Sequence, residues 1–467
     1  MRSVRRGSAL AGYAFALVVS IAPAQQPAAS TPQEPQAPKQ VQPRGEQVHT
    51  GVTSGLDAET RLEALIADHQ FSLVAAQLDK LPTEQAQLFR GILANRNNDA
   101  KSSIELLVPL VDQVAAGGNL AEEKLLRKTL AEDYLRTGDM ADAAKAYEAL
   151  AERLQGHLST EELDEIELPL KLAALAANHP RTTVEPYEPF QIQITRNPLG
   201  LTDLPVYVDA RPHSWMMDPT APFNLIARTV AKEAGLKISN EFAMIHSLTG
   251  RPMQVHTTVI PRFTIGGRVT LRNMTAFVFD DADYVFPKSH YQVEGELGYA
   301  ALSALGSLTI SADSTVEIRP FKPARAGEKE DPPMPGARFY LDGDQMLVAL
   351  GARGQERIFV IDAAGQQTYF TSRYYDEHAE TFANQKMELF AVPGPQNKLP
   401  QPAFVAETIH LTVGPAEVDA HSIQVLTQPI GLTALDDVYG MLGMDFLDQL
   451  KSYTFDYRTM TFGVRTE

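Results

Sequence analysis

The chain has 467 residues, 44% of them apolar and 8% aromatic, so it is long enough for two or three packed domains and is not a disordered protein. A formal net charge of −17 repels phosphate backbones, which argues against a nucleic-acid partner. Cysteine is absent, and this excludes disulfides, thiolate metal sites and a cysteine nucleophile.

Residues 1–24 have the pattern of an export signal. Three early arginines precede an apolar run that is too short to span a bilayer comfortably, and the small residues Ala22-Pro23-Ala24 suit a signal peptidase. We therefore predict a signal peptide that is cleaved to leave a periplasmic or secreted protein. An uncleaved N-terminal anchor is the alternative, and no later segment is apolar and long enough to span a membrane.

Two segments of different composition follow the signal. Residues 25–54 are rich in Pro, Gln and Ala, contain few large apolar side chains, and predict a disordered linker. Residues 55–180 carry apolar side chains at helical spacing without strand-like alternation, and predict an all-helical domain.

Small and aromatic residues recur within the helical domain at two sets of matching offsets. The sets are Ala131, Tyr134, Gly138, Ala143 and Tyr147, and about 40 residues earlier Gly91, Ala94, Asn98, Ser103 and Leu107. Their spacing resembles the tetratricopeptide repeat, in which small residues let paired helices approach. An ordinary bundle of helical hairpins is the alternative. Either architecture suits a binding or spacing module with a protein partner.

From about residue 189 onward, short alternating segments rich in Val, Ile, Thr and Phe predict a β-rich region. Two stretches of this region read alike. In each, two apolar strands flank a turn and the second strand leads into an aspartate, Asp218 in the first stretch and Asp362 in the second. A helix-compatible segment follows each aspartate, at residues 225–236 and 369–379.

The downstream segments repeat as well. Residues 263–267 resemble 411–414, and the segment around Gly298 resembles the segment around Gly443. The aspartates are 144 residues apart and these glycines 145. Because chance similarity rarely keeps its register over some 80 residues, we predict a tandem duplication.

The combination of an apolar strand, an aspartate at a turn, and a later apolar-apolar-glycine element resembles the retropepsin-like aspartic proteases. Residues 440–447, Gly-Met-Leu-Gly-Met-Asp-Phe-Leu, are similar to a motif near the end of bacterial members. The resemblance implies a double acid-protease β fold after the helical domain, with one half at residues 188–322 and the other at 337–467. The overall fold class is then multidomain, α plus all-β.

The resemblance also implies a catalytic pair, Asp218 and Asp362, brought together within one chain. Two neighbouring carboxyls do not both ionise, so one activates a water while the protonated one polarises the scissile carbonyl. The expected activity is hydrolysis of polypeptides without a metal or cofactor, at mildly acidic to neutral pH.

The remaining site residues are also implied by the resemblance. Hairpin flaps over the cleft are expected at residues 247–250 and 393–395, although ordinary surface turns explain these segments equally well. Gly298 and Gly443 are expected to be structural. The expected substrate-binding residues are Thr220, Ala221, Gly250, Gly365 and Gly394.

Both copies depart from the family pattern at the loop after the aspartate. Pro219 and Ala363 stand where the family has a Thr or Ser whose hydroxyl ties the two halves together, and Thr220 and Ala364 replace a glycine. Glu296 stands where an apolar residue is expected, and we interpret it as pointing to solvent or as marking decay of that half.

Two hypotheses follow for the function. The chain is either an active aspartic endopeptidase or an inactive pseudo-protease that binds peptides or proteins, with the helical domain as adaptor. A third interpretation makes the helical domain the functional part and the β region its scaffold. No zinc-peptidase, serine-hydrolase or nucleotide-binding motif is present, and the acidic run Asp280, Asp281 and Asp283 is interpreted as a solvated turn.

Overall fold

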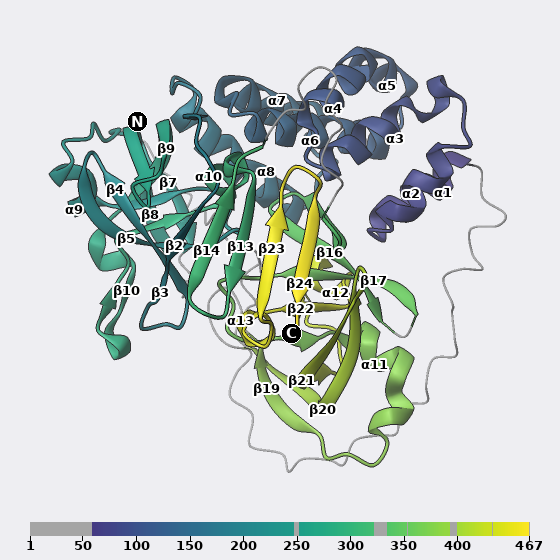
Figure 1. Cartoon of the computed structure of the whole chain (residues 1–467). Helices are drawn as coiled ribbons and strands as arrows, with labels where there is room; N and C mark the ends of the chain where they lie inside the picture. Colours follow the sequence, from purple (N-terminus) through teal and green to yellow (C-terminus); the bar gives the residue numbers. More distant parts are fainter. Residues whose placement is uncertain are drawn as a thin grey trace, which may run out of the picture.

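The structure, a computed structural model, describes residues 58–246, 252–321, 334–352, 354–392, 399–431 and 433–466. The predicted signal peptide at 1–24 and the predicted linker at 25–54 lie outside these residues. Helices form the first part of the described chain, and two β-sheet regions lie beside and below them in Figure 1.

The region predicted to be helical is helical. Local capping fixes where individual helices begin. At the helix that begins at Thr160, the Ser159 hydroxyl accepts the Glu162 N–H at 3.2 Å, and the Glu162 carboxylate accepts the Ser159 N–H at 2.7 Å. The Asn119 side chain caps the helix that begins at Leu120 by accepting the N–H groups of Ala121 and Glu122. The helices are α1 (Ala58–Ala67), α2 (Phe71–Leu78), α3 (Thr83–Arg96), α4 (Ala100–Leu107), α5 (Val111–Gly117), α6 (Leu120–Arg136), α7 (Met140–Arg153) and α8 (Thr160–Ala176).

The small residues noted in the sequence lie where helices meet. The hairpin of α3 and α4 brings Gly91 against Leu107, and any side chain at Gly91 would overlap the Leu107 side chain. In the hairpin of α6 and α7, Ala131 and Ala143 are fully buried, and Ala131 packs in one apolar cluster with Tyr147. Small side chains therefore set the close approach of each helix pair.

The first sheet surrounds Asp218 and has nine strands, with the path β1-β9-β6-β12-β5-β4-β8-β7 and β3 beside β4. Its centre is almost entirely apolar and includes the only tryptophan, Trp215. The strands are β1 (Thr183–Val184), β3 (Thr195–Arg196), β4 (Thr202–Val208), β5 (Arg211–Met217), β6 (Leu225–Ala227), β7 (Ala243–His246), β8 (Pro252–Ile265), β9 (Val269–Phe279) and β12 (Gly295–Leu297). A separate short ladder pairs β10 (Val285–Phe286) with β11 (Tyr291–Gln292).

The second sheet has thirteen strands among the described residues, three of which come from residues 188–322 and the rest from residues 337–467. Its order is β19-β20-β21-β18-β22-β17-β16-β15-β24-β23-β13-β14-β2. The strands are β2 (Phe190–Gln193), β13 (Ser307–Ser311), β14 (Thr315–Arg319), β15 (Ala337–Asp342), β16 (Gln345–Ala352), β17 (Gln355–Ile361), β18 (Tyr369–Phe370), β19 (Glu388–Val392), β20 (Leu399–Val413), β21 (Ala416–Leu426), β22 (Gly440–Leu442), β23 (Ser452–Asp456) and β24 (Thr461–Arg465).

The two β regions are joined along β13 and β23, which lie side by side in the middle of Figure 1. These strands pair antiparallel, and the hydroxyls of Thr309 and Thr454 are 2.8 Å apart across the junction. On one side of this junction β13 is followed in the sheet by β14 and β2, and on the other side β23 is followed by β24 and β15. Strands from the residues 188–322 therefore complete a sheet with strands from 337–467.

The segments after the two aspartates are only partly helical, which corrects the sequence-based prediction. Residues 225–227 form β6 and residues 369–370 form β18; short helices, α9 (Arg228–Glu233) and α11 (Ser372–His378), come after them. Both strands are fully buried on both faces, so apolar periodicity alone does not distinguish them from buried helix. Short helices α10 (Tyr299–Leu302), α12 (Thr433–Asp436) and α13 (Met444–Leu447) complete the set.

Candidate active site

Asp218 follows the last residue of β5 and lies at the centre of a tight loop. Its N–H donates to the carbonyl of Leu297 at 3.0 Å, and its side chain is 1% exposed. The carboxylate Oδ1 accepts three hydrogen bonds, from the Thr220 N–H at 2.9 Å, the Thr220 hydroxyl at 2.5 Å and the Ala221 N–H at 3.2 Å. The loop thus holds the carboxyl group in one orientation.

Asp362 follows β17 in the same way. Its N–H donates to the carbonyl of Leu442 at 3.0 Å, and its Oδ1 accepts the N–H groups of Ala364 at 3.1 Å and Gly365 at 2.7 Å. A Cβ at Gly365 would lie 2.7 Å from the Asp362 Cγ, so only glycine leaves room for the carboxylate. Gly365, predicted to bind substrate, lies directly against the carboxyl group of Asp362.

The two carboxyl groups share one electrostatic environment. Burial raises the pKa of Asp218, and the hydrogen bonds from Thr220 and Ala221 counter part of that rise. Burial, and after it the charge of Asp218, raises the pKa of Asp362 to about 7. Because Asp218 accepts three hydrogen bonds and Asp362 two, the charged form is favoured at Asp218 over Asp362.

Gly298 and Gly443, predicted to be structural, pack against the two aspartate loops. The Gly298 N–H donates to the Asn224 side chain at 3.0 Å, and the Gly443 N–H donates to the Thr368 hydroxyl at 2.9 Å. A Cβ at Gly298 would lie 2.6 Å from the Ala221 carbonyl oxygen. One at Gly443 would lie 2.8 Å from backbone at residue 367, so neither position has room for a side chain.

Sequence reasoning missed Asn224 and Thr368, the residues that anchor these glycines. Each is the sixth residue after its aspartate, and this repeated spacing was a usable signal. It also missed Asp445, whose carboxylate accepts the Thr368 N–H at 2.8 Å and the Thr368 hydroxyl at 2.5 Å. These contacts join the segment after Asp362 to the glycine element far downstream.

Glu296 does not point to solvent, and that prediction is wrong. The residue is 0% exposed because β12 lies between β5 and β6 in the sheet and is buried throughout. Its Oε2 accepts the Tyr284 hydroxyl at 3.0 Å. Burial first, and then the charge of Asp218, raises the pKa of Glu296 well above its usual value, which favours the neutral form of this side chain near Asp218.

The predicted flap segments lie between paired strands. Residues 247–250 fall between β7 and β8, and residues 393–395 fall between β19 and β20. Both segments, with Gly250 and Gly394, lie outside the described residues. The strands that flank each segment pair antiparallel.

No group of three or more His, Cys, Asp or Glu side chains in the described part of the chain is arranged to hold a metal ion. In the acidic turn, Arg228 pairs with Asp280, and the Thr229 hydroxyl donates to Asp281 at 3.0 Å. Those carboxylates are thus engaged by side chains of α9. The described helices include none that is long and apolar enough to cross a membrane.

Comparison with known proteins points to one family for part of the chain. Residues 204–301 match the family model described as aspartyl protease, and this segment contains Asp218, Glu296 and Gly298. One similar solved structure is a retropepsin-like aspartic protease from Rickettsia conorii, 16% identical, covering 30% of this chain and 94% of its own, with a TM-score of 0.20. None of the curated sequences compared with the chain is similar enough to count as a relative.

Proposed function

We propose that the chain is an exported aspartic endopeptidase in which Asp218 and Asp362 form the catalytic pair within one molecule. The observation that carries this proposal is the repeated loop geometry. Each aspartate donates its N–H to the glycine-bearing strand that pairs beside it, and each carboxylate is held by N–H groups two and three residues further on. The aspartyl-protease match over residues 204–301 supports the same activity.

The proposal includes a tandem origin, with residues 188–322 and 337–467 as two copies of one retropepsin-like half. The pairing of Met217 with Leu297 and of Ile361 with Leu442 is parallel in both. The junction of β13 with β23 supports an axis of pseudo-symmetry between the copies. Such an arrangement supplies one aspartate from each copy to a shared cleft.

The order of ionisation assigns the two roles. Asp218, with three hydrogen bonds to its carboxylate, is the base that takes a proton from the attacking water. Asp362 stays protonated up to about pH 7 and donates a hydrogen bond to the scissile carbonyl oxygen. Activity should therefore fall as the pH rises past about 7, because Asp362 then loses the proton that the mechanism needs.

The test is cleavage of a mixed peptide library by the chain from residue 25 onward, between pH 4 and 8. Asp218→Asn and Asp362→Asn should each lower the rate by roughly 10²–10⁴-fold, the range for loss of a general acid or base. Asp112→Asn, an exposed position on α5, is the matched control and should leave the rate unchanged. A rate that survives either catalytic substitution would rule out the pair.

A pseudo-protease that binds peptides is the second candidate, favoured by the residues after each aspartate. Pro219 and Ala363 carry no hydroxyl, so neither side chain can make the hydrogen bonds that would tie the two loops together. The expected signature is retained peptide binding without cleavage at any pH. The same library, followed by mass spectrometry for both bound and cleaved peptides, separates the two functions.

The proposal also covers export of the protein and binding of a protein partner by the helical region. The basic and apolar start of the chain supports a periplasmic or secreted protein, tested by N-terminal sequencing of the mature form, which should begin at Gln25. The helical hairpins, with Gly91 and Ala131 at their contacts, support a tetratricopeptide-like domain that binds a protein partner.

A further inference from the structure

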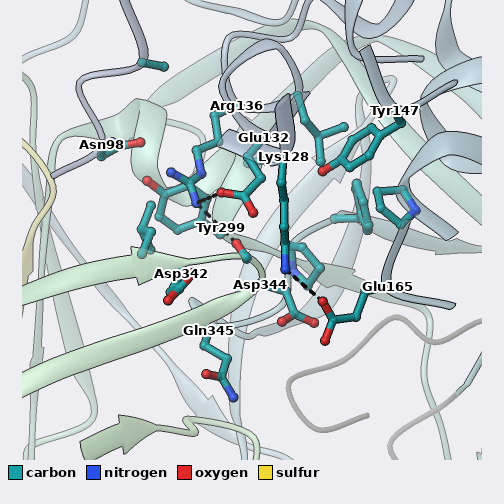
Figure 2. A pocket seen from close by; sticks show the side chains of 18 of the residues that line it. Asn98, Lys128, Glu132, Arg136, Tyr147, Glu165, Tyr299, Asp342, Asp344 and Gln345 are labelled. Carbon is teal, nitrogen blue, oxygen red and sulfur yellow. Dashed lines mark hydrogen bonds and ion pairs between the residues drawn. The ribbon is translucent and has the colours of Figure 1, made fainter. Parts of the chain in front are cut away.

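A cavity of about 1210 Å³ lies between the helical region and the β regions. Helices α6 and α8 form one side, and the turn between β15 and β16 and the loop that follows Asp218 form the other. Figure 2 shows charged side chains converging on it from α6, α8 and the β15–β16 turn. Its volume exceeds the roughly 300–1,000 Å³ of small-molecule sites, so it is large enough for a segment of polypeptide.

The cavity has a rigid edge because the β15–β16 turn is clamped to the helices. Arg96 pairs with Asp342 at 2.9 Å and with Glu132 at 3.1 Å, and Arg136 donates to the Gly343 carbonyl at 3.3 Å. Burial would raise the pKa of Asp342, but Arg96 and then His69 hold it well below its usual range. The turn is therefore fixed by ion pairs, and its next residue, Asp344, faces the cavity (Figure 2).

The negative charge of the carboxyl groups beside the β15–β16 turn is only partly neutralised by the neighbouring Lys and Arg side chains. Burial, and then the charges of Glu165 and Glu132, raise the pKa of Asp344 to about 6, although the nearby Lys128 opposes this. Lys128 itself is shared, because its amine pairs with Glu165 at 2.8 Å. The buried Glu132 Oε1 has no hydrogen-bond partner among the described residues. A cation entering the cavity would meet the Asp344 carboxyl and the unpartnered Oε1 of Glu132, while Glu132 Oε2 keeps its ion pairs with Arg96 and Arg136.

Apolar walls accompany the charges. Tyr147, Leu150, Ile166 and Phe277 line the same cavity, and carboxyl groups outnumber Lys and Arg side chains among all its lining residues. Acidic groups set among apolar ones suit a basic side chain flanked by apolar residues. An anionic ligand is disfavoured by the same charges.

We propose that this cavity binds a polypeptide segment through a Lys or Arg side chain placed between Asp344 and Glu132. The segment's neighbouring apolar side chains rest on the walls near Tyr147 and Phe277. The binding does not require the proposed peptidase activity. A link between this binding and catalysis does rest on the proposed peptidase function. Thr220 lines the cavity and donates a hydrogen bond from its hydroxyl to Asp218. A bound peptide would therefore contact the loop that carries the proposed base.

The test measures binding by calorimetry to the chain from residue 25 onward carrying Asp362→Asn, so that no probe is cleaved. The probe is the blocked peptide acetyl-Ala-Leu-Lys-Leu-Ala-amide, beside its Arg and Glu counterparts. The Lys and Arg peptides should bind at least about tenfold more tightly than the Glu peptide, since 1.4 kcal/mol corresponds to a factor of ten. Equal affinity for the three peptides would overturn the proposal.

Variants then locate the site. Asp344→Asn should weaken binding of the Lys peptide about tenfold, Asp344→Glu should restore most of it, and Glu417→Gln, an exposed carboxyl on β21, should change nothing. Surrounding protein raises the pKa of Asp344, but its side chain keeps solvent access through the cavity, so its substitution should leave the unfolding midpoint near that of the parent chain. Unchanged affinity in Asp344→Asn would place the peptide elsewhere and refute the assignment.

Photo-crosslinking separates this cavity from the proposed cleft. A Lys peptide with a benzophenone side chain in place of one leucine should attach to α6, α8 or residues 219–224, as read by mass spectrometry. Attachment to the β7–β8 or β19–β20 hairpin instead would contradict the proposal. An inactive wild type that still binds at the cavity would refute only the peptidase function, and an active one without cavity binding would refute only this site.

Discussion

The loops that carry Asp218 and Asp362 share one backbone arrangement but differ in what surrounds it. Asp218 has a hydroxyl donor in Thr220 and a buried acid, Glu296, on the adjacent strand. Asp362 has only backbone donors, and Met441 takes the place of Glu296 beside it. Backbone geometry thus repeats while side-chain chemistry diverges, which gives the two carboxyls different affinities for a proton.

Substitution of the glycines packed against the two aspartate loops, Gly298 and Gly443, should have the largest effect on the free energy of unfolding. Gly298→Ala places a Cβ 2.6 Å from the Ala221 carbonyl oxygen, while Gly443→Ala meets backbone at 2.8 Å. Because backbone on both sides cannot move cheaply, we expect a loss of about 3–5 kcal/mol in the free energy of unfolding for Gly298→Ala and a smaller loss for Gly443→Ala. Urea unfolding measures both.

The matched control for this pair is Gly117→Ala at the end of α5, where an added Cβ has nothing within 4 Å. It should stabilise the chain slightly or leave it unchanged, as expected for Gly to Ala in a helix. A loss in Gly298→Ala no larger than in this control would contradict the tight packing at the Asp218 loop.

Burial of Glu296 gives the next largest effect, on the pH dependence of stability. Its pKa is raised in the folded chain, so the folded state keeps the proton while the unfolded state releases it above about pH 4.5. Stability should therefore fall as the pH rises above that value, by up to about 1.4 kcal/mol per pH unit from this group. Glu296→Met, which copies Met441, should make the fall shallower.

The measurement is urea unfolding at pH 5 and pH 7.5. Asp218 and Asp362 also have raised pKa values but are present in both chains, so the difference in slope reports Glu296 together with its coupling to Asp218. The reverse change, Met441→Glu, should add a second buried acid and steepen the fall. Parallel pH profiles for the parent chain and Glu296→Met would show that Glu296 ionises freely in the folded state.

The sequence predicted well those features that depend on local pattern. The strand before each aspartate, the loop itself and the glycine element are short segments whose apolar alternation and glycine position are visible in the chain, and their spacing repeats. Glu296 was misjudged because a charged residue between apolar ones is expected to face water. Its burial depends on β12 lying between β5 and β6, which only the sheet order reveals.

Contacts between segments that are distant in the chain could not be predicted from local sequence patterns either. Nothing local in β13 indicates that it pairs with β23, about 145 residues later, or that Asp342 is held by Arg96 of the helical region. Such contacts arise from complementary surfaces that are formed by many residues together. The cavity beside Asp344 follows from that docking and was therefore not predicted either.

The smallest expected effect comes from changing the hydroxyl donors of the two loops, at positions 220 and 364. Thr220→Val removes the hydroxyl that donates to Asp218 and should raise the pKa of that carboxyl, moving the acid limb of kcat/KM upward by about one pH unit. Ala364→Thr adds a hydroxyl at the matching position, should lower the pKa of Asp362 from about 7, and should move the alkaline limb downward. Each substitution should shift one limb only, because each alters the hydrogen bonds of one carboxyl. If each variant instead moved the other limb, the roles of base for Asp218 and acid for Asp362 would be reversed, and if both moved the same limb the assignment would have to be abandoned.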